Sequence, residues 1–271
     1  LEQRVLLTSG DLDPAFGNAG QVVTEFHQAA DWSKTALTSV LQADGKIVAA
    51  GEGAIARYLP DGSLDISFGI EGKAAFPNYV RSIAIQTSGK IIAVGGTDVT
   101  SSQDFVIARY LSNGTLDTSF DGDGLVLTDF GSFDGAYDVA IQPNGRVVVA
   151  GVSNDSVAVA RYNIDGSLDT TFDGDGRVVR KINSHLDDAA YSVAIQSNGR
   201  IVVGGKSLIS YSPGSLYRQF FVMRLHSNGA LDRSFGGDGY LNTPIGSGDE
   251  VRDLVIQPDA RILVSGSSRF V

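Results

Sequence analysis

Hydrophobic and polar residues alternate along this chain in short blocks, which predicts β-strands separated by tight turns. Residues 146–151 read RVVVAG, with four consecutive small or β-branched apolar residues. Such a run predicts a strand buried on both faces, and the segments 137–142, 157–162 and 177–182 are its expected partners. A Pro-Asn-Gly turn at residues 143–145 predicts a hairpin between the first two strands. The unit therefore reads as four antiparallel strands, named a to d in chain order.

This four-strand pattern occurs five times. Its clearest marker is a Leu-Asp-x-x-Phe link, whose aspartates are Asp13, Asp65, Asp117, Asp169 and Asp232, at spacings of 52, 52, 52 and 63 residues. Repeated antiparallel units of this length, with strands buried on both faces, predict the blades of a β-propeller. We therefore predict an all-β fold, a single propeller domain over residues 1–271.

The five copies of each strand predict five four-stranded blades. One blade would combine strands a and b from the C-terminus with strand c at residues 4–7 and strand d from residue 21. Such interlocking ends would close the ring and leave no strand edge exposed. The last two residues resemble the start of a further strand c, so a piece of a longer repeat array is an open alternative.

The third unit, VAIQPNGRVVVAGVSNDSVAVARYNIDGSLDTTFDGDG, resembles the delta-60 repeat of bacterial proteins, and its five copies cover nearly the whole chain. It is also similar, more loosely, to NHL-type propeller repeats. The resemblance implies a propeller, often within large exported or surface-associated bacterial proteins, and implies no reaction. We therefore expect a secreted or cell-surface location in a bacterium, for a monomer or a part of a longer exported chain. The N-terminus itself lacks the pattern of a signal peptide.

Charge and composition narrow the range of partners. The net charge is −10 and the isoelectric point is near 4.7, without a basic patch, so we expect no nucleic-acid partner. The absence of cysteine excludes disulfides and thiolate metal sites. No apolar run approaches the ~18 residues of a membrane span, so we expect no membrane insertion.

The link and the acidic stretch that follows it raise the question of a metal site. Asp117 is predicted to cap one helical turn that brings Leu116 and Phe120 onto the same face. The two acid positions after the phenylalanine are both filled in only two copies, by Asp121 and Asp123 and by Asp173 and Asp175, whereas a glycine is kept in all five. This pattern favours a turn, because a shared calcium site needs shared acids. We expect no cofactor, and weak calcium binding at these two copies stays open.

A comparison of the loops indicates a functional face. Loops a–b and c–d emerge on one face of a four-stranded blade and are repeated in this chain, whereas loops b–c and d–a emerge on the other face and differ in every unit. Variable loops on a rigid scaffold are the usual place for recognition. The ligand-binding candidates on that face are His27, Trp32, Tyr79, Arg81, Asp134, Tyr137, Asp138, His185, Asp187, Asp188, Tyr191, Tyr211, Tyr217, Asp249, Glu250, Arg252 and Asp253.

Aromatic, acidic and arginine side chains around one rim suit a glycan, a peptide or a small cation-bearing ligand. The first hypothesis is therefore a non-enzymatic binding or surface-display module, whose partner is a glycan, a peptide or a protein. A hydrolase or lyase is the second, with rim carboxylates such as Asp138 and Asp253, or His27 and His185, at the channel mouth. A purely structural repeat domain of a larger exported protein is the third.

Overall fold

The computed structural model describes residues 12–24, 36–97, 103–131, 133–183, 187–212 and 215–269, without the side chains of residues 209–216, 247 and 269. These ranges contain sixteen strands and no helix, so the prediction of an all-β protein is confirmed. Accordingly, no helix within them is long and apolar enough to cross a membrane.

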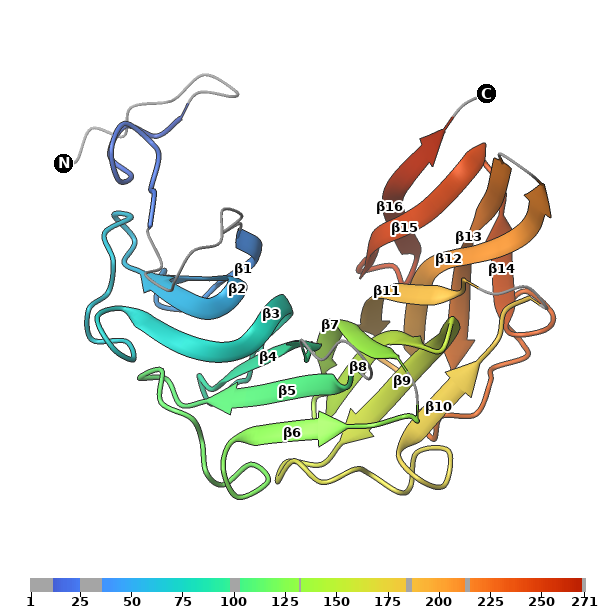
Figure 1. Ribbon diagram of the computed structural model, residues 1–271, viewed down its shortest axis with the longest axis horizontal. Coiled ribbons are helices and arrows are strands. Elements are labelled where there is room, and N and C mark those ends of the chain that lie inside the picture. Colours follow the sequence, from blue (N-terminus) through green and yellow to red (C-terminus); the bar gives the residue numbers. More distant parts are fainter. Residues whose placement is uncertain are drawn as a thin grey trace.

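All sixteen strands are short or of moderate length, and Figure 1 shows them arranged around a common opening. In chain order they are β1 (Ala36–Leu41), β2 (Ile47–Tyr58), β3 (Lys73–Ile85), β4 (Ile91–Gly96), β5 (Phe105–Tyr110), β6 (Leu125–Thr128), β7 (Asp134–Ile141), β8 (Val147–Ser153), β9 (Ser156–Tyr162), β10 (Arg177–Arg180), β11 (Ala189–Ile195), β12 (Ile201–Ser212), β13 (Ser215–Leu225), β14 (Tyr240–Thr243), β15 (Ser247–Ile256) and β16 (Ile262–Arg269).

The strands group into blades as the repeats predict. Strands β7 to β10 form one four-stranded antiparallel sheet and β11 to β14 form the next. The six-stranded sheet β1 to β6 holds two blades, because β2 and β3 each contain two strands of the repeat. Residues 47–51 of β2 pair with β1 and residues 54–56 pair with β3, which in turn pairs with β4 through residues 79–85. The protein is therefore a β-propeller with strands β1, β3, β7, β11 and β15 as successive neighbours.

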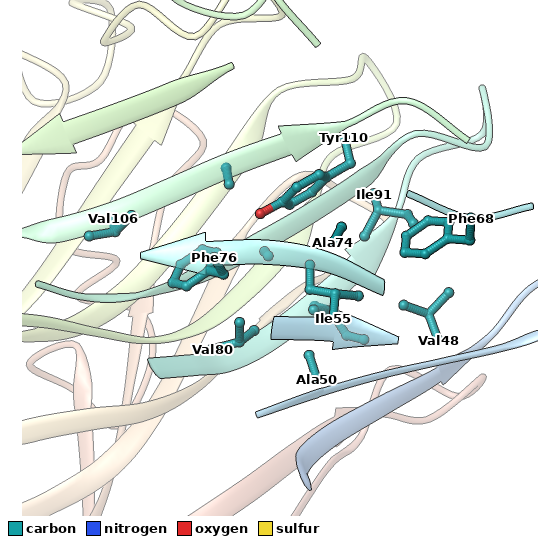
Figure 2. Packing of buried hydrophobic residues seen from close by; sticks show 13 residues of the cluster. Val48, Ala50, Ile55, Phe68, Ala74, Phe76, Val80, Ile91, Val106 and Tyr110 are labelled. Atoms are coloured by element: carbon teal, nitrogen blue, oxygen red, sulfur yellow. The ribbon is translucent and has the colours of Figure 1, made fainter. Parts of the chain in front are cut away.

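The hydrophobic core lies between blades rather than within one sheet. In the cluster of Figure 2, Val48 and Ile55 of β2 pack with Ile91 and Tyr110 from the next blade, and all four are at most 1% exposed. The hydroxyl of Tyr110 also donates a hydrogen bond of 2.6 Å to the carbonyl of Ala75 in the preceding blade. Strands b and c can be apolar at every position because both of their faces are covered by neighbouring blades.

The link is a hydrogen-bonded turn, so the predicted helical turn is wrong. The amide of Phe120 donates to the carbonyl of Asp117 (2.9 Å), and the amide of Ser119 donates to Asp117 Oδ1 (3.1 Å). The predicted cap is thus made by an aspartate turn, a local geometry that competes with helix formation. Gly124 has a φ of 92°, and a Cβ there would lie 2.9 Å from the Cβ of Leu116, which explains its presence in every copy.

The two ends of the array stay apart in the described residues. Strands β15 and β16 form a sheet of two strands, and residues 21–24, predicted as strand d, form no strand. Figure 1 places the N-terminal segment and β16 on opposite sides of an opening. The predicted strand c at residues 4–7 lies outside the described ranges. A closed ring of five blades therefore remains a prediction.

Candidate functional site

The variable loops meet on one face, as the sequence comparison predicts. The amide of Asp134 in a d–a loop donates to the carbonyl of Gln103 in a b–c loop (2.7 Å). The same kind of bond joins the amide of Asn154 to Phe133 (3.0 Å) and the amide of Asp188 to Asp155 (3.1 Å). Adjacent blades therefore support one another's variable loops.

A β-bulge at the start of each strand a shapes this face. The register between strands a and b shifts at Arg81, Tyr137, Tyr191 and Arg252. A bulge re-aims the side chain of the extra residue. The bulge also brings the backbone of strand a close to a glycine of strand b: a Cβ on Gly151 would lie 1.9 Å from the carbonyl oxygen of Gly135, the residue before its partner Ala136. The local sequence therefore positions four of the candidate residues by the same device.

The four bulge residues form a continuous row, which we call the bulge belt: Arg81, Tyr137, Tyr191 and Arg252. The guanidinium carbon of Arg81 lies 5.1 Å from the ring centroid of Tyr137, and the two tyrosine rings meet edge to face at 5.0 Å and 89°. The guanidinium carbon of Arg252 lies 5.3 Å from the ring of Tyr191. Burial, with the neighbouring Glu250 carboxylate, raises the pKa of Tyr191, so its hydroxyl is neutral at physiological pH.

Beneath the belt, the next residue of each strand a forms an alternating row of hydroxyls and carboxylates: Ser82, Asp138, Ser192 and Asp253. Ser82 Oγ donates to Asp138 Oδ1 (2.7 Å), and the amide of Val193 donates to Asp138 Oδ2 (2.8 Å). Ser192 Oγ lies 3.2 Å from Asp138 Oδ2 and 3.3 Å from Asp253 Oδ1.

Asp138 therefore ties together three successive blades at the axis. Burial raises its pKa, although the hydrogen bonds from Ser82 and the amide of Val193 oppose this effect. Ser192 has a single proton to donate, so it serves either Asp138 or Asp253 at any moment.

Charged residues flank the belt on the side of the fourth blade. Lys206 Nζ lies 2.5 Å from Asp187 Oδ1, and Arg218 Nη2 lies 2.6 Å from Asp187 Oδ2. Glu250 pairs with Arg252 at 2.5 Å and lies 3.7 Å from Arg218. The candidates Asp187 and Glu250 are therefore neutralised by the protein's own cations, two of which, Lys206 and Arg218, sequence reasoning missed.

Three of the candidate carboxylates hold the d–a loops closed. Asp134, Asp188 and Asp249 are fully buried and accept the amides of Phe130, Ile182 and Ile245 at 2.6, 2.7 and 2.7 Å. They lie four positions before Asp138, Ser192 and Asp253 of the row described above. These aspartates therefore form a repeat, which the varied loop lengths hide in the sequence. Their position gives them a structural role rather than access to a ligand.

One group of three carboxylates with metal-ligand spacing occurs in the described ranges. Oxygen atoms of Asp104, Asp129 and Asp134 lie within 4.8 Å of one another. Burial raises the pKa of Asp104, with a further contribution from Asp129, and burial also raises the pKa of Asp134. Two of the four link acids bind their own turns instead: Asp123 Oδ1 accepts the amide of Leu125 at 2.8 Å, and Asp175 Oδ1 accepts that of Arg177 at 2.9 Å.

The other two link acids, Asp121 and Asp173, have φ values of 54° and 50°, the left-handed conformation that Gly17, Gly69 and Gly236 adopt at the same position of the other copies. His27, Trp32 and His185 lie outside the described residues, as does the side chain of Tyr211.

The remaining candidates lie at the edges of the belt. Tyr79 is 36% exposed beside Arg81, with 5.9 Å between the guanidinium carbon and the ring centroid. Tyr217 is 41% exposed on β13. Ser82 and Ser192 were missed because a serine in a strand carries no signal of its own until the strands are placed around the axis.

Comparisons with known proteins agree with the propeller fold. Four stretches, residues 42–68, 86–120, 142–172 and 196–235, match a family model described as a domain of unknown function (DUF5122) beta-propeller. No curated protein matches the chain.

Three solved structures illustrate the likeness of the backbone. They are a protein of unknown function from Bacteroides caccae (11% identity, 80% of this chain and 89% of that one, TM-score 0.45), a gluconolactonase from Xanthomonas campestris (13%, 84% and 68%, 0.47) and YCF48 bound to D1 peptide (13%, 85% and 60%, 0.42). At these identities and TM-scores, none of them carries an argument about function.

Proposed function

We propose that this chain, four stretches of which match the DUF5122 β-propeller model, is a non-enzymatic binding module whose bulge belt recognises an acidic glycan. The observation that carries the proposal is the geometry of the belt. Two tyrosines in contact offer a hydrophobic platform for a sugar ring, and an arginine lies at each end of it. Arginine is the side chain best suited to bind a carboxylate through two parallel hydrogen bonds.

Arg81 is the residue expected to bind the anionic group. It is exposed, and it makes no ion pair within the described part of the chain, whereas Arg252 is already paired with Glu250. Its guanidinium rests on Tyr137, which orders the side chain without using its hydrogen-bond donors. An ordered but unpaired cation favours an anionic ligand.

The same contacts disfavour a cation-bearing ligand, which the sequence left open. A cation binds the face of an aromatic ring through the ring quadrupole. Both belt tyrosines already have a protein guanidinium within 5.3 Å of the ring centroid. A ligand cation would meet repulsion from Arg81 and Arg252 at the place where it would stack.

The enzymatic alternative has one observation in its favour. Asp138 has a raised pKa, and it shares the hydroxyl of Ser192 with Asp253, so the two carboxylates are close neighbours. However, four donors already point at Asp138: the hydroxyls of Ser82 and Ser192 and the amides of Val193 and Val139. A carboxyl with both oxygens occupied has little capacity to exchange a proton with a substrate, so we favour binding without catalysis.

The test is titration calorimetry with an oligogalacturonate, a uronic-acid oligosaccharide, beside a neutral oligosaccharide of equal length. We expect the acidic ligand to bind and Arg81→Ala to weaken it at least about tenfold, because a charge-assisted pair contributes ~1.5–3 kcal/mol. Arg233→Ala is the matched control: it removes the same charge from an exposed link residue on the repeated face. Equal affinity of wild type and Arg81→Ala, or equal binding of the neutral oligosaccharide, would contradict the proposal.

The same calorimeter separates the alternatives. Heat that continues after saturation, together with shortened oligosaccharide in the cell, would support the hydrolase or lyase, and loss of that signal in Asp138→Asn would place it at the axis. Export to the cell surface and weak calcium binding remain proposals. A larger heat of binding in the presence of calcium would support calcium binding.

A further inference from the structure

A groove lies between the third blade (β7 to β10) and the fourth (β11 to β14), on the face opposite the bulge belt. Strand β7 carries a belt residue near its start and ends just before Gln142, whose side chain lines the groove together with Arg146 and Arg161. The fourth blade contributes Gly199 and Asn228 from its own turns. The groove is open to solvent and has a volume of about 450 Å³, which is within the ~300–1,000 Å³ of ligand sites in proteins. We call it the junction groove.

The walls of the junction groove are fixed by contacts between the two blades. The backbone amide of Asp173, just after the link phenylalanine, donates to the carbonyl of Asn228 (2.8 Å). Arg161 of strand c donates through Nη1 to the carbonyl of Ser227. The same two contacts, a link amide and a strand-c arginine, join the first blade to the second and the second to the third. The groove is therefore preformed, which lowers the entropic cost of binding a ligand there.

Two arginines of the junction groove share a single carboxylate. Arg161 Nε lies 2.7 Å from Asp169 Oδ2, and Arg146 Nε lies 3.1 Å from the same oxygen. Arg161 uses its remaining nitrogens on the carbonyl of Ser227 and the hydroxyl of Thr171. Neither Nη of Arg146 has a hydrogen-bond partner among the described residues, and its side chain is 35% exposed. The cluster therefore carries one uncompensated positive charge, and its free donors are on Arg146.

Comparison of the repeats shows that the turns around this groove have lost their acids. The equivalent groove between the first and second blades is lined by Asp44, and the one between the second and third by Asp165. The same two positions of the junction groove are Asn144 and Asn228, and no acidic side chain lines it within the described ranges. The Oδ1 atom of each asparagine accepts an amide of its own turn at 3.2 Å. Both side-chain NH2 groups remain as donors beside the arginine.

The side-chain amide of Gln142 is buried in this lining without a partner for its oxygen. The residue is 7% exposed, and its Oε1 has no hydrogen-bond partner in the part of the chain that the structure describes. The equivalent Gln86 donates through Nε2 to the carbonyl of Gly145 in the next blade (3.4 Å), whereas Gln142 makes no such bond to Gly199. Buried polar groups are normally paired, so this amide has capacity for a ligand that carries an N–H or O–H group.

The groove therefore requires an anion for Arg146 and a donor for Gln142 in the same ligand. A peptide with an acidic side chain supplies both, because its backbone N–H is the donor. Asparagine and glutamine amides each combine donors with an acceptor, which matches the groups of a peptide backbone. No aromatic side chain lines the described groove, so a sugar ring would find no platform of the kind that the belt offers. An open groove also lets an extended chain enter and leave.

We propose that the junction groove is a second binding site, which takes an acidic peptide segment of a partner protein. A carboxylate of the peptide accepts hydrogen bonds from the Nη groups of Arg146, and a backbone N–H donates to Gln142 Oε1. The side-chain NH2 groups of Asn144 and Asn228 donate to peptide carbonyls. This site lies at the opposite end of β7 from the bulge belt, and it does not depend on the function proposed for the belt.

Titration calorimetry with a blocked pentaglutamate peptide, beside a blocked pentaglutamine peptide, tests the site. The buffer contains 0.15 M salt, so that the net charge of −10 is screened beyond ~8 Å. We expect pentaglutamate to bind and Arg146→Gln to weaken it about tenfold, because charge-assisted hydrogen bonds to the carboxylate are lost. Arg200→Gln is the matched control: Arg200 pairs with Asp232 at 2.8 Å and its side chain is 34% exposed, but it does not line the junction groove. Its affinity for pentaglutamate should equal that of the wild type.

Three results would overturn the proposal: no binding of pentaglutamate, equal affinity for the two peptides, or equal losses in Arg146→Gln and Arg200→Gln. Gln142→Leu gives a second measurement that does not disturb an ion pair. It should weaken pentaglutamate without lowering the urea midpoint of unfolding, since it removes an amide that has no partner in the free protein. A lower midpoint with unchanged peptide affinity would contradict the role assigned to Gln142.

Binding at the bulge belt is measured separately from binding at the junction groove. Pentaglutamate should bind Arg81→Ala as it binds the wild type, and it should bind with unchanged affinity to protein saturated with oligogalacturonate. Competition between the two ligands, or loss of pentaglutamate binding in Arg81→Ala, would place the peptide at the belt and overturn the junction site. Failure of oligogalacturonate to bind, with pentaglutamate lost only in Arg146→Gln, would overturn the belt proposal and support this one.

Discussion

The buried cluster around Asp117 offers the sharpest test of how the repeat is held together. Asp117 Oδ2 lies 2.6 Å from Arg109 Nε and 2.7 Å from Lys90 Nζ, and the side chains of Asp117 and Arg109 are 6% and 2% exposed. Asp117→Asn keeps the oxygen that accepts the amide of Ser119 but removes the charge. The arginine is then left buried without a counter-ion.

The expected cost follows from that uncompensated charge. Removing one partner of a buried ion pair destabilises a protein by ~3–5 kcal/mol. For a domain of this length, each kcal/mol lowers the melting temperature by ~2–4 °C, so a decrease of roughly 6–20 °C is expected. Asp13→Asn is a matched control within the same chain, because Asp13 accepts the amide of Ala15 (2.9 Å) but has no cationic partner in the described residues. It should cost less than about 0.5 kcal/mol.

The assay is urea denaturation followed by far-ultraviolet circular dichroism, with thermal melts in parallel. A double variant, Arg109→Met with Asp117→Asn, adds a second comparison, since removing both charges of a buried pair is often nearly neutral. The reasoning would be refuted by equal shifts for Asp117→Asn and Asp13→Asn, which would mean that the aspartate acts only as a turn cap.

Two further predictions follow from the same turns. Gly124→Ala should lower the urea midpoint of unfolding more than Gly122→Ala. Both glycines have a positive φ (92° and 89°), but only at Gly124 would a Cβ meet other atoms within 4 Å. Equal midpoints would contradict the steric argument. Stability should also fall steeply in acid, because the pKa values of the link aspartates are lowered, namely those of Asp65, Asp117, Asp169 and Asp232. The Ser234 hydroxyl is the main cause for Asp232. For the other three, burial raises the pKa, but hydrogen bonds and cations outweigh that effect. Their contribution is complete above the unfolded value of ~3.9 and is lost as the pH falls below it, so the cost of Asp117→Asn should shrink in parallel urea titrations near pH 3.

Comparison of the repeats predicted the features of this protein that depend on neighbouring residues in the chain. The strands, the turn glycines and the turn role of Asp117 depend on residues close together in the chain, and each recurs at a fixed position. Comparison of the repeats did not predict the ion pairs of Asp117, because Lys90, Arg109 and Asp117 come from three separate segments that meet only in the folded blade. Local reasoning also chose a helical turn where a shorter hydrogen-bonded turn is formed.

The candidate site was likewise predicted only in part from the sequence. Strand starts such as Tyr137 and Arg252 were identified because they differ between otherwise similar units. The buried loop carboxylates were grouped with them, since loops of unequal length hide that Asp134, Asp188 and Asp249 are one repeated position. The bulge that re-aims each belt residue leaves no mark of its own, other than a strand-b glycine whose need becomes visible only once the opposing carbonyl is placed.

The repeat also explains why the proposed recognition surface can vary at the bulge. The hydrogen bonds between blades are made by the link amides, the strand-c arginines and the row of Ser82, Asp138 and Ser192. The bulged side chains meet across blades through ring and cation–π contacts instead. The equivalent residue is Leu37 in the first unit, arginine in two units and tyrosine in two others. Substitution there leaves these hydrogen bonds intact, so under the proposed binding function the bulge is the position at which a repeat protein of this kind can change its ligand without changing its fold.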